Sequence, residues 1–372
     1  MNEHLFNKDA PLAIADQGCF FVGGNYVESP TGRISGGQMY VQYQIPARQT
    51  QPYPVVMIHG GGQTGVNFLG TPDGCRGWAD YFLTSGYAVY VVDQPGRGRS
   101  GFISKIYGEA ANRSAEAIAD RFTAPERVNL WPQARLHTQW PGSGTPDDEA
   151  FDQFYSSQVE SMADVGAGER MMREAGSALL DRIGPAILLT HSQSGPFGWT
   201  IADARPKLVK GIVAVEPNGA PLYEIQFTGA PDYFADESIG RPWGITRNAL
   251  TFDPPAAAAS EMKFVKQAKA DGPGLVRCWL QAEPARQLVN LMGVPILMVT
   301  GEASYHAPYD HGTSQFLRQA GVEHTFARLA DVGLRGNGHM MMLEKIIWKL
   351  RVTLISGCRR TLNKVLLKQK VT

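Results

Sequence analysis

The segment with the greatest capacity for chemistry is Leu188–Gly195, an apolar run that leads into a tight turn of small residues. Ser192 lies at its centre, with Thr190 and Ser194 two positions to either side. A nucleophilic serine between a strand and a helix sits in a strained turn and needs small neighbours, because the helix packs closely behind it. The pattern therefore predicts Ser192 as a nucleophile. The alternative is an ordinary strand-to-helix turn whose serine caps the helix.

A glycine-rich loop, His59–Gly62, follows the apolar run Val55–Ile58. Backbone amides that carry no bulky side chain can turn toward an oxyanion and stabilise it. The amide of Gly61 and the amide of Gln193, the residue after the candidate nucleophile, are predicted as the two donors. The alternative is a glycine-rich turn with a structural role only.

A histidine that follows the last predicted strand is the candidate general base. His339 lies in the flexible segment Gly336–Met342, just before an apolar stretch. A lone histidine is more often a structural residue, and only its position favours His339 over His306, His311 and His324.

Four motifs together resemble the α/β-hydrolase superfamily: His59–Gly62, Asp93–Ser100, Thr190–Gly195 and Gly338–His339. The resemblance extends from about Phe20 to Lys345 and is nearest to an esterase branch in which Glu-Pro-Asn-Gly follows the sixth strand. Thr190 and Ser194 replace the two glycines of the usual nucleophile motif. The resemblance implies an α/β fold with a mostly parallel central sheet flanked by helices, and a serine esterase.

The acidic member of the site requires a separate argument. In the commonest arrangement of the superfamily, an aspartate stands three residues after the glycine that closes strand 7, but here Gly301 is followed at that distance by Ser304. Glu216 directly follows an apolar run, where an open α/β sheet holds its active site. We therefore expect Glu216 to orient His339; Glu302 and then Asp310 are the alternatives.

Two other segments could be interpreted as a dinucleotide site and a metal site. Gly96–Gly101 matches the pattern GxGxxG after a predicted strand, but a dinucleotide site would require this loop to open a helix and an acid about twenty residues later. His306 and His311 have no carboxylate at helical spacing between them, which does not favour a metal site. We expect neither a cofactor nor a metal.

The elements that position these residues alternate between strands and helices. Short apolar runs predict buried strands, as is typical of parallel sheets: Val55–Ile58, Ala88–Val92, Ala186–Leu189, Gly211–Val215 and Pro295–Val299. Helical patterns lie between them: Gly77–Ser85, Met162–Arg182 and Phe197–Ala204. Cys19–Val27 and Gln38–Ile45 predict an antiparallel hairpin before the parallel sheet. Alternating strands and helices predict right-handed crossovers.

The predicted catalytic domain spans residues 1–345. Two long connections, at about 101–161 and 217–292, are predicted to form a cap over the serine, because loops of that length are usually lids or binding elements. The second connection has helical as well as proline-containing stretches. Glycine, aromatic, methionine and histidine residues are the candidates for the pocket wall: Gly62, Trp199, His306 and Met341, with Trp131 and Tyr233 as further aromatic candidates.

Composition limits the class of protein. The chain has 43% hydrophobic and 19% charged residues, which is typical of packed globular proteins. Residues 346–372 hold seven basic residues and no acid, so residues 1–345 carry a formal charge of −7, which argues against nucleic-acid binding. The four cysteines are dispersed, which predicts reduced thiols. The sequence shows no leader-like run and no apolar run long enough to span a membrane, so we expect a cytoplasmic protein. The oligomeric state stays open, a homodimer included.

The basic C-terminal tail has two explanations. In the first, one extra adenine in the message shifts the reading frame, so that Lys345–Arg351 would read Lys-Asn-Asn-Leu-Glu-Ile-Ala. In the second, Ile346–Leu367 is a basic amphipathic helix that contacts an acidic surface or a membrane.

The predicted activity is hydrolysis of a small or medium carboxylic ester or lactone through an acyl-enzyme on Ser192. Hydrolysis of carbon–carbon or thioester bonds by the same residues is the nearest alternative, because the cap sets substrate choice. A binding protein without catalysis is the more distant alternative.

Overall fold

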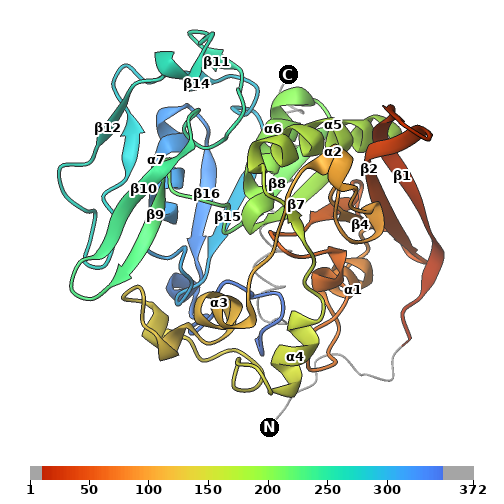
Figure 1. The fold of residues 1–372 in the computed structure, drawn as a ribbon, viewed down its shortest axis with the longest axis horizontal. Helices are drawn as coiled ribbons and strands as arrows, with labels where there is room; N and C mark the ends of the chain where they lie inside the picture. Colours follow the sequence, from red (N-terminus) through yellow and green to blue (C-terminus); the bar gives the residue numbers. More distant parts are fainter. Residues whose placement is uncertain (1–10, 347–372) are drawn as a thin grey trace.

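The computed structural model describes residues 11–346, and one eight-stranded sheet dominates this part of the chain (Figure 1). The strands follow the order β1-β2-β4-β3-β7-β8-β15-β16. Their bounds are β1 Ile14–Ser29, β2 Gly32–Pro46, β3 Val55–Ile58, β4 Val89–Asp93, β7 Ala186–His191, β8 Val209–Val215, β15 Ile296–Thr300 and β16 His324–Arg328. The hairpin β1-β2 joins β4 in antiparallel pairing, and the strands from β4 to β16 pair in parallel. The predicted fold class is confirmed.

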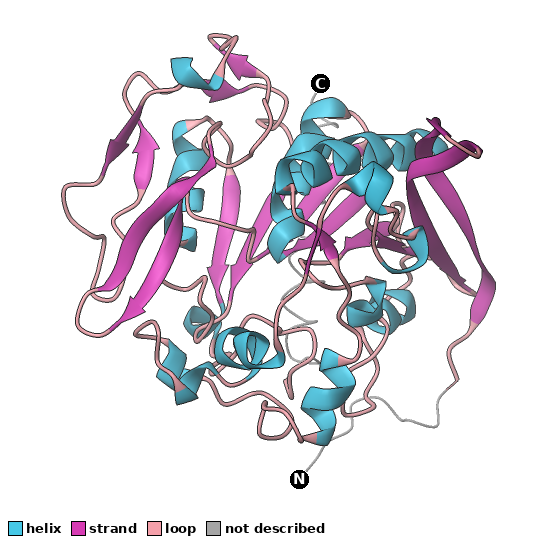
Figure 2. Ribbon diagram, viewed as in Figure 1, coloured by secondary structure: helices cyan, strands magenta, loops and turns pink. Residues whose placement is uncertain are grey.

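Both faces of the central strands are buried, which explains their unbroken apolar sequences. Val55 and Met57 belong to one hydrophobic core, and Val56 and Ile58 belong to the other, because successive side chains of a strand point to opposite faces. Four helices flank the sheet (Figure 2): α1 Trp78–Thr84, α5 Val165–Ile183, α6 Gly195–Ala204 and α7 Asp310–Gln319. Buried residues of α5, α6 and α7 fill one core, and α1 contributes to the other.

The first long connection folds into short elements. They are α2 Ser104–Tyr107, β5 Ala110–Ala111, α3 Ala115–Ile118, α4 Glu149–Tyr155 and β6 Ser161–Met162, with several 3-10 turns and one π-helical turn between them. In Figure 1, α3 and α4 lie below the central sheet.

The second long connection is built from strand pairs, and the described residues between β8 and β15 contain no α-helix. The pairs are β9 Leu222–Gly229 with β10 Tyr233–Arg241, β11 Phe252–Asp253 with β14 Gln287–Leu288, and β12 Phe264–Lys266 with β13 Trp279–Gln281. The expected helical stretches are wrong here. Apolar and polar residues alternate along β9, a period of two that fits a half-exposed strand rather than a helix.

Residues 347–372 lie outside the described part of the chain, so both explanations of the tail stay predictions. Within residues 11–346, none of the helices has the length and apolar character needed to cross a membrane. The three cysteines in this range, Cys19, Cys75 and Cys278, are free thiols.

Candidate active site

The candidate nucleophile lies where β7 ends and α6 is about to begin. Ser192 has φ +56°, in the left-handed region that non-glycine residues seldom adopt, and its side chain is almost buried. The Ser194 hydroxyl holds the turn, because it accepts a hydrogen bond from the His191 amide and donates one to the Ile58 carbonyl, each at 2.7 Å. Gly195 permits the close approach of the next segment: a Cβ there would lie 2.4 Å from the Cα of Pro217. Ser194 thus stabilises the turn where the usual motif has a glycine.

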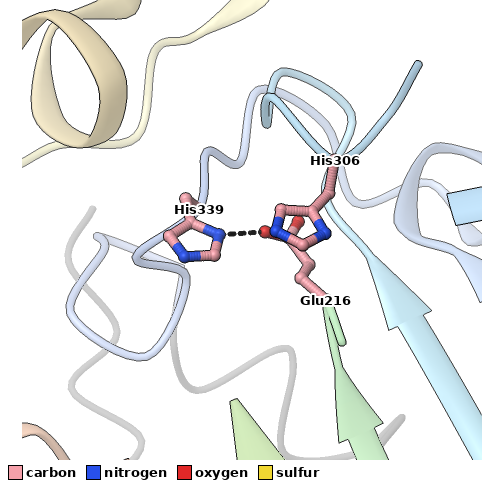
Figure 3. Close-up of side chains that lie close together, drawn as sticks. All are labelled: Glu216, His306 and His339. Carbon is pink, nitrogen blue, oxygen red and sulfur yellow. Dashed lines mark hydrogen bonds and ion pairs between the residues drawn. The ribbon is translucent and has the colours of Figure 1, made fainter. Parts of the chain in front are cut away.

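His339 and Glu216 form a buried pair at the carboxyl end of the sheet. The Nδ1 atom of His339 lies 2.5 Å from Oε2 of Glu216, and both side chains are fully buried (Figure 3). Glu216 also accepts hydrogen bonds from the Gly301 amide at 2.7 Å and from the Ser304 hydroxyl at 2.6 Å. Burial raises the pKa of Glu216, and these two donors oppose that rise. Ser304, which occupies the common acid position of the superfamily, therefore supports an acid on the neighbouring strand.

The imidazole of His339 is held in its neutral form. Burial lowers its pKa, and the nearby side chains of His191, His306, Arg121 and Arg113 lower it further. A neutral imidazole whose Nδ1 faces a carboxylate can accept a proton at Nε2, which is what a general base must do.

Tyr305 is the residue that sequence reasoning missed. Its hydroxyl lies 3.5 Å from Nε2 of His339, and Tyr305 lines the same cavity as Ser192. Burial raises the pKa of this phenol, so it is protonated at neutral pH. No spacing rule identifies such a tyrosine; its only signal is its place in the loop that follows a sheet strand.

The two alternative acids have other partners. Glu302 binds Arg335 at 2.6 Å and the amide of Gly336 at 2.9 Å. Asp310 accepts a hydrogen bond from the Thr300 hydroxyl at 2.5 Å and pairs with Nδ1 of His306 at 2.9 Å. Glu216 is therefore the carboxylate that contacts His339.

The predicted oxyanion donors lie beside the serine. A Cβ on Gly60 would lie 3.1 Å from the Cβ of Ser192, so this loop can approach the nucleophile only because it lacks side chains. Gly61 and Gln193 line the same cavity as Ser192. The Gln193 side chain accepts a hydrogen bond from Nη2 of Arg97 at 3.0 Å, which fixes the residue whose amide would face the oxyanion.

The loop with the pattern GxGxxG has a structural role. Asp93, at the end of β4, accepts hydrogen bonds from the amides of Gly65 and Arg99 and from the Arg99 side chain. A short 3-10 turn, Gly98–Ser100, follows instead of a helix, so the geometry of a dinucleotide site is not formed.

A cavity of about 230 Å³ opens at Ser192, and both long connections contribute to its wall. Phe122 comes from the first connection, and Asn218 and Phe227 come from the second. A neighbouring cavity of about 330 Å³ shares four residues with the first and is otherwise lined mainly by the first connection. The shared residues are Gly61, Arg113, Val165 and Gln193.

One predicted pocket residue, Gly62, lines a cavity, and the others do not. Gly62 lines the larger cavity, and its amide donates to the Ser161 hydroxyl at 3.2 Å. Trp199 and Met341 are corrections, because both are buried and line neither cavity. Trp199 packs with the sheet residues of one hydrophobic core, and Met341 packs in the other.

The other aromatic candidates also lie behind the wall. Trp131 is buried, donates to the Ala303 carbonyl at 3.0 Å and packs against the ring of Tyr305. Tyr233 begins β10 and lines neither cavity. His306 is another correction, because it stacks on His339 with ring centroids 5.0 Å apart instead of facing a cavity.

Glu216, His306 and His339 offer ligand atoms that lie within 4.8 Å of one another, as a metal site would require (Figure 3). The closest pair among these atoms is joined by the hydrogen bond between Glu216 and His339, and Nδ1 of His306 is paired with Asp310. This arrangement favours orientation of an imidazole over binding of a metal ion.

The loop that carries His339 is held by a second buried carboxylate. Glu344 accepts hydrogen bonds from the Gly338 amide at 2.8 Å and from Asn337 at 2.7 Å, and it pairs with Nε2 of His137 at 3.1 Å. Burial lowers the pKa of His137, but its hydrogen bonds to Glu126 and Glu344 outweigh that effect and raise the pKa to about 9. The first long connection is thereby attached to the loop of the candidate base.

The fold and this arrangement define an α/β hydrolase with a serine as its candidate nucleophile. Residues 55–345 match the model of the family described as Alpha/beta hydrolase family, and the chain belongs to that family. The chain is 47% identical over 327 residues to a protein of Fungal sp. (strain ATCC 74256) described as "Probable secreted lipase phiG", which covers 88% of this chain and 85% of the relative.

Solved structures show the same likeness. A bacterial esterase shares 25% of its residues with this chain at a TM-score of 0.60, over 95% of this chain and 98% of the esterase. Esterase Est22 has 14% identity and a TM-score of 0.43, over 92% of this chain and 81% of its own. The family, the fungal relative and the bacterial esterase at a TM-score of 0.60 support an ester hydrolase.

Proposed function

We propose that the protein hydrolyses carboxylic esters or lactones through an acyl-enzyme on Ser192. The hydroxyl oxygen of Ser192 attacks the ester carbonyl while Nε2 of His339 takes the hydroxyl proton. Glu216 orients the imidazole and stabilises the imidazolium that forms. The observation that carries the proposal is the buried 2.5 Å contact between His339 and Glu216. Tyr305, which contacts His339, lines the same cavity as Ser192, and Ser192 is held on a left-handed turn.

The negative charge of the tetrahedral intermediate falls on the former carbonyl oxygen. The amides of Gly61 and Gln193 are the proposed donors to that oxygen, and each contributes about 3 kcal/mol of transition-state stabilisation. Collapse of the intermediate breaks the bond to the alcohol, which leaves with the proton from His339. A water molecule then gives a proton to His339 and attacks the acyl group. The bond to the serine oxygen breaks, this oxygen takes the proton back from His339, and the acid is released.

Labelling with a fluorophosphonate tests the proposal, because this reagent modifies an activated serine. We expect one label per chain, on the peptide that contains Ser192, and loss of both label and ester turnover in Ser192→Ala. Ser156→Ala is the matched control, since Ser156 is exposed and lines neither cavity. Turnover by Ser192→Ala at the wild-type rate would overturn the proposal.

The choice of substrate distinguishes the related chemistries. A panel of esters, lactones, thioesters and β-diketones with matched chain lengths separates an esterase from a thioester or carbon–carbon bond hydrolase. We expect the esters or lactones to give the highest kcat/KM. Absence of both the label on Ser192 and turnover of every panel member would instead indicate a protein that binds without hydrolysis.

A further inference from the structure

The cavity at Ser192 is rich in arginine, which is unexpected for a site that would bind a purely apolar acyl chain. Arg113, Arg121 and Arg247 line its wall, together with a single carboxylate, Glu224. Two of the arginines come from the first long connection and one from the second.

The single carboxylate is already shared. Oε1 of Glu224 accepts a hydrogen bond from Arg247 and another from Arg241, both at 2.8 Å. Burial would raise the pKa of Glu224, but the two arginines hold it below its usual value. The carboxylate is therefore ionised. Its Oε1 is engaged by these two guanidinium groups, and Arg121 lowers the pKa of Glu224 further without a hydrogen bond to it.

Arg113 and Arg121 have no carboxylate partner among residues 11–346. Arg121 lies over the rings of Tyr305 and Phe227, with its guanidinium carbon 4.4 and 5.3 Å from the ring centroids. Its Nε is buried and has no hydrogen-bond partner in this part of the chain. A guanidinium stacked on aromatic rings keeps its edge free for an anion.

These charges lie close to the reacting atoms. The ring under Arg121 belongs to Tyr305, whose hydroxyl lies 3.5 Å from Nε2 of His339. Burial and the neighbouring histidines lower the pKa of His339 most, and Arg121 and Arg113 lower it further. An anion bound between the two arginines would offset their charge as the imidazolium forms.

From this geometry we propose that the substrate is a small ester that carries a carboxylate, and that Arg121 and Arg113 bind this carboxylate in the cavity beside Ser192. The inference rests on the proposed esterase function and adds the class of substrate. A volume of about 230 Å³ is at the small end for a ligand site, which suits a short dicarboxylic acyl chain or a small acidic alcohol. A bidentate arginine–carboxylate contact supplies both charge and orientation.

Two pairs of substrates test the proposal in its two orientations. The 4-nitrophenyl monoester of adipic acid is compared with 4-nitrophenyl hexanoate, which has the same number of acyl carbons and no carboxylate. The butanoate ester of 4-hydroxybenzoate is compared with that of 4-hydroxybenzamide, which places the charge on the alcohol. We expect kcat/KM to be at least tenfold higher for the anionic member of one pair, because charge-assisted hydrogen bonds from guanidinium groups are stronger than neutral contacts. The pair that shows the preference identifies the half of the ester that enters the cavity.

Variants connect the preference to the two arginines. Arg121→Gln should lower kcat/KM for the anionic ester about tenfold more than for its neutral counterpart, and Arg113→Gln should act in the same direction. Arg127→Gln is the matched control, because Arg127 is exposed and lines neither cavity. Turnover of the neutral ester shows that a variant is folded.

The outcomes separate the two proposals. Equal or better turnover of the neutral member in both pairs would overturn the carboxylate proposal and leave the esterase intact. An anionic preference that survives in both Arg121→Gln and Arg113→Gln would also overturn it. Absence of turnover of all four esters by the wild-type protein would overturn the proposed function itself.

Discussion

Replacement of Glu216 by glutamine tests the most constrained contact of the site. The carboxylate accepts hydrogen bonds from the Gly301 amide at Oε1 and from Ser304 and His339 at Oε2. A glutamine can keep its oxygen toward Gly301, and its amino group then faces Nδ1 of His339. That ring nitrogen must become the acceptor, so the imidazole proton moves to Nε2. An imidazole in that tautomer cannot take the proton of Ser192.

The expected decrease in kcat has two causes. The imidazole of His339 loses the correct tautomer, and the imidazolium loses the negative charge that stabilises it. For this kind of site, substitution of the acid by its amide lowers kcat by about 10³- to 10⁴-fold. At 1.36 kcal/mol for each factor of ten, this corresponds to about 4–5.5 kcal/mol of transition-state stabilisation. The shape and volume of the side chain are nearly unchanged, so we expect a folded protein.

The assay is steady-state hydrolysis of a neutral 4-nitrophenyl ester, with Glu302→Gln as the matched control. Glu302 pairs with Arg335 and makes no contact with His339, so this control should keep kcat within about threefold of the wild-type value. The reasoning would be refuted if Glu216→Gln kept kcat within about tenfold of wild type, or if Glu302→Gln were the more damaging change.

Three further predictions follow from neighbouring contacts. Tyr305→Phe should lower kcat about three- to tenfold, because a neutral hydrogen bond near the reacting atoms is lost; unchanged kcat would contradict this. Arg121→Gln should move the acid limb of the pH profile of kcat/KM to higher pH, because a cation that lowers the pKa of His339 is removed; a move to lower pH would contradict this. His137→Gln should lower the free energy of unfolding, measured with urea, by about 3 kcal/mol at pH 6, since the folded pKa of about 9 exceeds the ordinary 6.5. This stabilisation is complete below pH 6.5 and disappears as the pH rises through 9, so an equal loss at pH 6 and pH 10 would refute it.

The sheet and the strand-borne residues of the candidate site could be predicted because their signals are local. Short β-branched runs bounded by glycine or aspartate are typical of strands buried on both faces, and the residue that follows such a run lies at the carboxyl edge. Ser192 and Glu216 each follow one of these runs, and the structure brings His339 to Glu216.

The walls of the cavity could not be predicted because they depend on contacts between distant segments. Trp199 is a large aromatic residue of a kind that often lines a pocket, but the sequence does not show which face of α6 it occupies. In the structure it lies in a hydrophobic core. Tyr305 and Arg121 are far apart in the sequence and meet only because the first long connection folds over the loop after β15. The helical reading of the second connection was wrong, because its short alternating runs become strands only when each one finds a partner.

Trapping of the acyl-enzyme tests the central claim most directly. The protein is mixed with excess 4-nitrophenyl ester, quenched in acid within the first turnover, and its intact mass and peptides are measured. The account predicts an added mass of one acyl group on the peptide that contains Ser192, formed together with one equivalent of nitrophenolate and absent in Ser192→Ala. An acyl group on another residue, or ester turnover by Ser192→Ala at the wild-type rate, would contradict it.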